Sequence, residues 1–147
     1  MLFRSQDQEE EKTVSMEHDF MYWMRICYNP FLEKDGNFAW VELNNWIDEI
    51  TKMGKEHLKR FLAFCLDASR DCLLKNVGAG QISRFDDEFI PGLTRFSPFI
   101  KSENIEELAE LYDRAYYAVE RNANLKILML DLTFSVNVLL RRPSRNA

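Results

Sequence analysis

Residues 123–140 decide the fold, and they read Ala-Asn-Leu-Lys-Ile-Leu-Met-Leu-Asp-Leu-Thr-Phe-Ser-Val-Asn-Val-Leu-Leu. The stretch contains no glycine or proline and is followed by Arg141, Arg142 and Pro143, which is typical of a helix that ends in cations and a proline stop. At about 100° per residue, its apolar side chains form two faces. The wide face comprises Leu125, Leu128, Met129, Leu132, Val136, Leu139 and Leu140, and the narrow face comprises Ile127, Phe134 and Val138. Because a helix with two apolar faces is usually enclosed by other helices, we predict that it lies buried at the centre of a bundle.

The composition favours a single helical domain. The chain has 147 residues, of which 46% are hydrophobic, enough for one domain with a sizeable core. Glycine and proline number only 5 and 4, which argues against the many tight turns of an all-β fold. The net charge of −5 argues against a protein whose whole surface binds nucleic acid. We therefore expect an all-α fold, a bundle of about five to six helices around a buried C-terminal helix.

Apolar residues at i, i+3, i+4 and i+7 predict four further helices. These span about residues 16–28, 38–53, 55–76 and 105–121. Between residues 81 and 101 prolines interrupt the pattern, so we expect one or two short helices with aromatic side chains pointing inward. The predicted caps and turns are a Ser15 cap, a turn over residues 35–37, a helix break at Gly54, a capping box of Asn104 with Glu107, and a tight joint over residues 122–124.

The ends of the chain lack this periodicity. Residues 1–15 are rich in acidic side chains, which predicts a flexible linker or tail. We expect the helical domain to span residues 16–142 and a second tail to span residues 143–147. Cys27, Cys65 and Cys72 are odd in number, which favours reduced core thiols in a cytoplasmic protein. The C-terminal apolar stretch is too short and too often interrupted by polar residues to span a membrane comfortably.

The sequence contains no motif for catalysis, for a cofactor or for a metal ion. His18 and His57 are its two histidines, and neither lies in an arrangement that binds zinc or a di-iron centre. We expect both at the surface, near helix starts. There is no phosphate-binding glycine-rich loop and no nucleophile elbow. We therefore expect a protein that is not an enzyme and has no cofactor, metal or small-molecule substrate.

A basic cluster offers a weak candidate for contact with DNA. It comprises Lys52, Lys55, Lys59 and Arg60, three of which share the spacing i, i+3 and i+7. Such lysines could touch phosphates, but a charged helix surface that only increases solubility is the alternative, and the negative net charge favours it.

Several sequence pieces, taken together, resemble a known family. They are Trp46-Ile47-Asp48-Glu49-Ile50, Gly54-Lys55-Glu56 with Lys59 and Phe61-Leu62, Arg70-Asp71, Phe96-Ser97-Pro98-Phe99-Ile100, and Asn122-Ala123-Asn124 before Lys126-Ile127-Leu128. In order and spacing, residues 16–142 are similar to the C-terminal domain of the delta-prime subunit of bacterial DNA polymerase III, in its Bacteroidetes-like version. None of these pieces is catalytic; each is a packing or capping pattern.

The resemblance implies a helical collar domain of the clamp loader, the complex that places the sliding clamp on primed DNA during replication. Collar domains of five subunits would pack into a ring, so the implied partners are the delta and gamma/tau subunits, with DNA contacted only through the assembled complex. The ATPase module and zinc-binding segment of that family are absent, so the chain is expected to be a fragment that neither binds nor hydrolyses ATP. The collar of delta or gamma/tau, an unrelated helical enzyme and a nucleic-acid-binding bundle are the alternatives.

We expect an interface of this kind on the irregular aromatic segment over residues 81–101 and on the last two helices. The candidate interface residues are Phe96, Phe99, Tyr116, Tyr117, Phe134 and Val138. A place in the ordinary core is the alternative for each of them, and it is favoured for Phe96 and Phe99.

Overall fold

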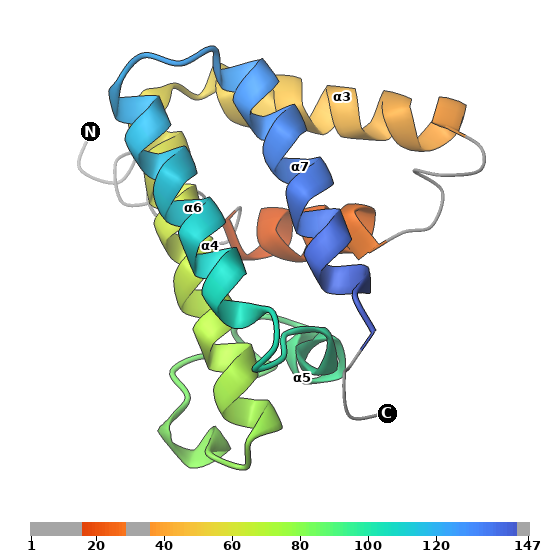
Figure 1. The fold of residues 1–147 in the computed structure, drawn as a ribbon, viewed down its shortest axis with the longest axis vertical. Helices are drawn as coiled ribbons and strands as arrows, with labels where there is room; N and C mark the ends of the chain where they lie inside the picture. Colours follow the sequence, from red (N-terminus) through yellow and green to blue (C-terminus); the bar gives the residue numbers. More distant parts are fainter. Residues whose placement is uncertain (1–15, 29–35, 144–147) are drawn as a thin grey trace, which may run out of the picture.

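The structure, a computed structural model, describes residues 16–28 and 36–143. Within these ranges every regular element is a helix, which confirms the all-α prediction (Figure 1). The elements are helix 16–28, α3 (Gly36–Lys52), α4 (Lys55–Asn76), η1 (Gly80–Ile82), α5 (Leu93–Phe96), η2 (Ser97–Phe99), α6 (Ile105–Glu120) and α7 (Leu125–Arg141). Three predictions lie outside the described residues: the acidic linker, the Ser15 cap of helix 16–28, and the tail beyond Pro143.

The predicted helix bounds agree closely with the structure. α4 spans the predicted residues 55–76, and α6 ends one residue before the predicted limit. Gly54, with φ +97°, separates α3 from α4 as expected. The exception is the predicted turn over residues 35–37, because Gly36 and Asn37 belong to α3. The first turn of a helix has backbone N–H groups without intrahelical partners, so residues of weak helix propensity are tolerated there.

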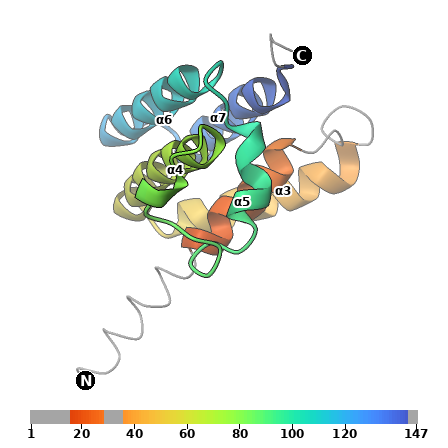
Figure 2. The same ribbon diagram turned by 90° about the horizontal axis from the view of Figure 1, so that it is seen from below.

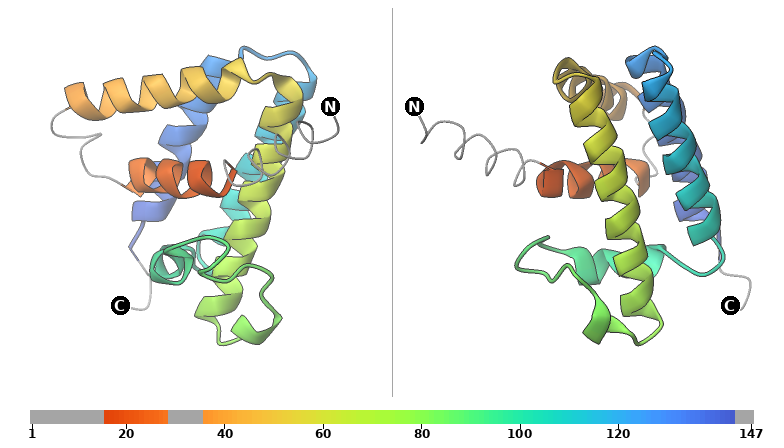
Figure 3. Two further views of the ribbon diagram at one scale, coloured as in Figure 1. Left: turned by 180° about the vertical axis from the view of Figure 1, so that it is seen from behind. Right: turned by 90° about the vertical axis from the view of Figure 1, so that its left-hand side faces the viewer.

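α4 is the element against which most of the others pack. It contacts α3, α5, η1, η2 and α6, whereas α7 contacts α3, α6 and helix 16–28. Figures 1 and 3 show α4 and α6 side by side, with α7 next to α6. Figure 2 shows α6 and α7 together on one side of the molecule. Among these elements α4 therefore has the most neighbours, and α7 packs on α3, α6 and helix 16–28.

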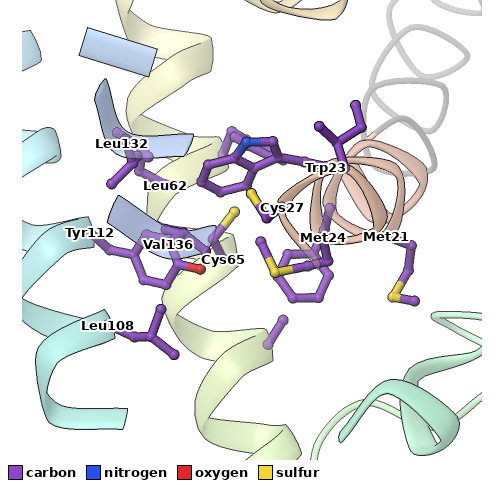
Figure 4. Packing of buried hydrophobic residues seen from close by; sticks show 14 of the residues in the cluster. Met21, Trp23, Met24, Cys27, Leu62, Cys65, Leu108, Tyr112, Leu132 and Val136 are labelled. Carbon is purple, nitrogen blue, oxygen red and sulfur yellow. The ribbon is translucent and has the colours of Figure 1, made fainter. Parts of the chain in front are cut away.

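The core centres on Trp23 of helix 16–28, whose side chain has no exposed surface. Its ring centroid lies 5.7 Å from that of Trp46 in α3, 5.9 Å from that of Phe61 in α4 and 6.2 Å from that of Tyr112 in α6. Figure 4 shows Trp23 with the labelled side chains of α4, α6 and α7 around it. Because each large aromatic side chain removes about 150–250 Å² from water, this cluster joins four helices.

The two apolar faces of α7 have different surroundings. On the wide face Met129, Leu132 and Val136 are buried, as predicted. The narrow face is exposed, with 66% of Ile127, 37% of Phe134 and 61% of Val138 accessible to solvent. The expectation that helices enclose α7 on all sides was therefore wrong for the narrow face.

A buried polar stripe lies beside the wide face of α7. Thr133 and Asn137 are buried in α7. The Thr133 hydroxyl accepts a hydrogen bond of 2.9 Å from Trp23 Nε1 and donates one of 2.6 Å to the Met129 carbonyl oxygen. The Asn137 amide donates to the carbonyl oxygen of Cys27. These bonds satisfy polar groups inside the bundle and fix the rotation of α7 against helix 16–28.

The segment between α4 and α6 contains three short helical elements, η1, α5 and η2, where one or two short helices were predicted. Phe96 is buried, Phe85 and Phe99 are partly buried, and Phe89 is 37% exposed. The Asp71 carboxylate of α4 accepts hydrogen bonds from the backbone N–H groups of Arg84 and Phe85, at 2.7 and 3.1 Å. A buried carboxylate of α4 thus holds this irregular segment in place.

The predicted capping box at α6 is wrong, whereas the joint before α7 is confirmed. The Asn104 side chain accepts from the Lys101 N–H and donates to the carbonyl oxygens of Phe99 and Leu139, so it joins α6 to the end of α7 instead of capping α6. Its partner in the predicted box, Glu107, pairs with Arg142. In the joint, Asn122 adopts φ +64° and Asn124 caps α7 by accepting from the Ile127 N–H.

Candidate interaction surface

The clearest candidate site is an exposed stripe along α7. It comprises Ile127, Asp131, Phe134, Val138 and Arg141, which we call the α7 stripe. All five side chains are exposed, and at 3.6 residues per turn they fall within an arc of about 80°. Three apolar side chains in line with two opposite charges are unusual for a surface that faces only water.

On one side, α3 borders the α7 stripe. The ring of Trp40 lies 5.4 Å from that of Phe134, measured between centroids. Lys126 Nζ lies 2.9 Å from Asp48 Oδ1 and ties the start of α7 to α3. These contacts are antiparallel, since the early residue of α3 meets the later residue of α7. The ring contact of Phe134 with Trp40 and the ion pair of Lys126 with Asp48 therefore fix α7 against α3 at two points.

On its other side, the stripe meets a groove between α6 and α7 of about 300 Å³. Leu111 and Val138 contribute apolar walls. Arg142 forms two contacts with the Glu107 carboxylate, at 2.7 and 3.3 Å, and this carboxylate raises the pKa of the Arg142 guanidinium. Arg114 lies 3.5 Å from Glu110 in the same groove. Apolar side chains next to charged ones are the usual composition of a protein–protein contact.

The structure divides the predicted interface residues into two groups. Tyr117, Phe134 and Val138 are exposed. Tyr116 is partly covered, with Lys59 Nζ 5.6 Å from its ring centroid. Phe96 is only 7% exposed, so it belongs to the core and is removed from the candidate surface.

Phe99 is also unsuited to an interface. Its ring centroid lies 3.9 Å from that of Tyr28 and 5.6 Å from that of Phe96, so it packs inward on the bundle. Ile127 was absent from the predicted interface, although it is the most exposed of the three apolar residues of the narrow face. Its spacing of seven residues from Phe134 was the signal that could have added it.

The predicted basic cluster is largely occupied by internal partners. Lys59 Nζ lies 3.2 Å from Glu56 and 3.5 Å from Glu120, and the hydrogen bond to Glu56 is the main reason that its pKa is raised. Lys55 donates to the Asn122 side chain at 2.6 Å. Arg60 donates to the Glu56 carbonyl oxygen at 3.3 Å, and Lys52 is exposed at the end of α3. This surface carries carboxylates among its cations, which lowers its attraction for phosphates.

The three cysteines and one of the two histidines lie in the core. No group of three or more His, Cys, Asp or Glu side chains among them could hold a metal ion. Burial raises the pKa of the Cys27 and Cys65 thiols well above the ordinary value, and that of Cys72 to about 12. These thiols therefore stay protonated and weakly nucleophilic. His18 is exposed as expected, whereas His57 is buried at 5% exposure, contrary to the expectation for it.

No family model, curated protein or solved structure was found to match this chain. None of the described helices combines the length and the apolar character that crossing a bilayer requires.

Proposed function

We propose that this chain is an oligomerisation domain of a bacterial clamp loader, equivalent to the collar domain of the delta-prime subunit of DNA polymerase III. The observation that carries the proposal is the exposed apolar surface of α7, with Ile127 and Val138 each more than half accessible. A domain that holds a ring of subunits needs such a surface on a rigid element, because association requires apolar area that can be removed from water.

The local geometry supports this proposal. Tyr117 of α6 is 58% exposed on the helix next to α7. The groove between α6 and α7 adds charged pairs that can select a partner by charge. Tyrosine and apolar side chains beside charged groups are the composition expected for a specific contact.

Neighbouring subunits supply the binding partners in this proposal, and the domain itself performs no chemistry. The partners are the collars of the delta and gamma/tau subunits, and DNA is reached only through the complete loader. Lys59 of the basic cluster already has two carboxylate partners, which is why we do not assign the domain a DNA site of its own.

The test is reconstitution with the loader subunits of the same organism. The chain is mixed with the delta and gamma/tau collars, and the mixture is separated by gel filtration. Co-elution of the parent chain, lost in the Val138→Asp variant and kept in the Ile82→Asp variant, is the expected result. Ile82 is a matched control because it is 64% exposed, against 61% for Val138, and lies in η1. Separate elution of the parent chain and both collars contradicts the proposal.

Adding a delta-prime collar as a third partner in the same experiment distinguishes the subunits. If the chain is the delta-prime collar, it binds the other two collars. A chain that fails to bind delta but binds delta-prime would be the delta collar, and a chain that binds further copies of gamma/tau in the same position would be a gamma/tau collar.

A further inference from the structure

Four of the five residues of the α7 stripe are arranged in a self-complementary order. Phe134 and Val138 lie one helical turn apart in its middle. Asp131 lies three residues before Phe134, and Arg141 lies three residues after Val138. Read in the opposite direction, the segment from Asp131 to Arg141 therefore has the same spacing of three, four and three residues, with its apolar residues in the middle and its two charges exchanged. Ile127 lies outside this symmetric set.

This symmetry fits one partner in particular, a second copy of the same helix running antiparallel. With a two-fold axis at the height of residue 136, Phe134 of one copy faces Val138 of the other. At the same time Asp131 of each copy faces Arg141 of the other, so both ends form an ion pair. A two-fold contact must use the same patch on both subunits, and this stripe meets that condition.

We propose that the α7 stripe is a self-association surface through which two copies of this chain form an antiparallel, two-fold symmetric dimer. The inference concerns the chain by itself and does not depend on the clamp-loader proposal. The charges at both ends specify the antiparallel direction, because a parallel pair in register would place Asp131 against Asp131 and Arg141 against Arg141.

The surroundings of the stripe are compatible with this contact. Trp40 flanks Phe134 and widens the apolar area on the α3 side. The guanidinium of Arg141 has five N–H donors. It can therefore bind a carboxylate of a second copy in addition to the contacts that Arg141 makes within its own chain. One helix face is a small interface, and complexes below about 1,200 Å² are typically weak, so we expect the dimer to dissociate when the chain is diluted.

The measurement is sedimentation equilibrium of the full chain over about 5–500 µM protein. The expected mass rises from 17.4 kDa toward twice that value with increasing concentration. The Val138→Asp variant is expected to stay monomeric at every concentration, because it places a charge in the apolar centre of the contact. Ile82→Asp, an equally exposed apolar site away from α7, is expected to dimerise like the parent chain.

A charge exchange tests the direction of the helices. Asp131→Arg alone places two cations together at each end, and Arg141→Asp alone places two carboxylates together, so each is expected to weaken dimerisation at least about tenfold. The double variant restores both ion pairs in exchanged positions and is expected to dimerise within about threefold of the parent chain. Circular dichroism confirms that each variant is folded, and an unfolded single variant is replaced by Asp131→Asn or Arg141→Gln.

Three results would overturn the inference. The first is a parent chain that remains monomeric at 500 µM. The second is a Val138→Asp variant that dimerises as well as the parent chain, which would move the contact elsewhere. The third is a double variant as weak as the single variants, which would exclude the antiparallel pairing. None of these results depends on whether the loader subunits bind.

Discussion

The two apolar faces of α7 are chemically similar, yet one forms the core and the other faces solvent. On the wide face Val136 has no exposed surface, whereas on the narrow face Val138, two residues later, is 61% exposed. The charged residues mark the difference. Asp131 and Arg141 lie within the α7 stripe. Beside the wide face lie Thr133 and Asn137, which are buried, neutral and hydrogen-bonded. Apolar side chains alone do not identify the inner face of a helix; the polar residues among them do.

The largest difference in stability is expected between two variants that each place a charge on one of the two faces of α7. Val136→Asp puts a carboxylate into the core without a partner and is expected to unfold the chain or to lower its free energy of unfolding by more than about 4 kcal/mol. Val138→Asp is expected to change that free energy by less than about 0.5 kcal/mol. Urea unfolding at low protein concentration, followed by circular dichroism, checks both variants. Similar losses in the two variants would contradict the assignment of inner and outer faces.

Truncation of apolar side chains is expected to give the same contrast at smaller magnitude. Leu132 is 4% exposed. Leu132→Ala should lower the free energy of unfolding by about 2–5 kcal/mol, because it leaves a cavity in the core. Ile127→Ala should stay within about 0.5 kcal/mol of the parent chain, since Ile127 is 66% exposed and alanine favours helix. The urea midpoints of the two variants give the comparison, and an Ile127→Ala loss above about 2 kcal/mol would show that the narrow face is covered.

Hydroxyl groups allow a finer comparison. Thr133→Val keeps the shape of the side chain but leaves Trp23 Nε1 without its acceptor, and is expected to cost about 1–3 kcal/mol. Ser135→Ala removes a hydroxyl on the groove side of α7 and is expected to cost less than about 0.5 kcal/mol. Thermal unfolding of both variants measures this difference. Equal melting temperatures would mean that the bond to Trp23 contributes nothing to stability.

The pH dependence should show the smallest effect, and it concerns the inner side of α4. Burial raises the pKa of Cys72 from 9.0 to about 12, so the folded chain holds this proton more tightly than the unfolded chain. The contribution of Cys72 is therefore fully present below pH 9 and is lost as the pH rises toward 12. Unfolding free energies of the parent chain and of Cys72→Ala between pH 7 and 10 should diverge in slope above about pH 9, with the parent chain falling more steeply. Parallel slopes would contradict this account of the thiol.

The sequence predicted most of the helices because their periodicity is local. The bounds of α4 follow from Gly54 before it and the glycines after it, and the joint before α7 follows from Asn122 and Asn124. These residues act on the backbone next to them, so neighbouring sequence contains the necessary information.

The site could be predicted only in part, because its residues depend on contacts across the fold. Phe96 and Val138 are both apolar residues on helical turns, and only packing places the first inside and the second outside. Asn104 was assigned to a local cap, but it bonds to Leu139, which is 35 residues away in the chain. His57 near the start of α4 is buried by the tertiary fold, which its position in a helix does not reveal.

The most direct test of the central claim is the accessibility of α7 measured by thiol labelling. The three native thiols are buried, so Val138→Cys adds one accessible thiol to a protected background, whereas Val136→Cys adds a fourth protected thiol. At low protein concentration, the thiol at position 138 should react with a disulfide reagent as fast as a free peptide thiol, and that at position 136 only on unfolding. Raising the protein concentration, or adding a partner, should slow labelling at position 138. Equal protection of both positions in the dilute chain would contradict an α7 with one inner face and one outer face for association.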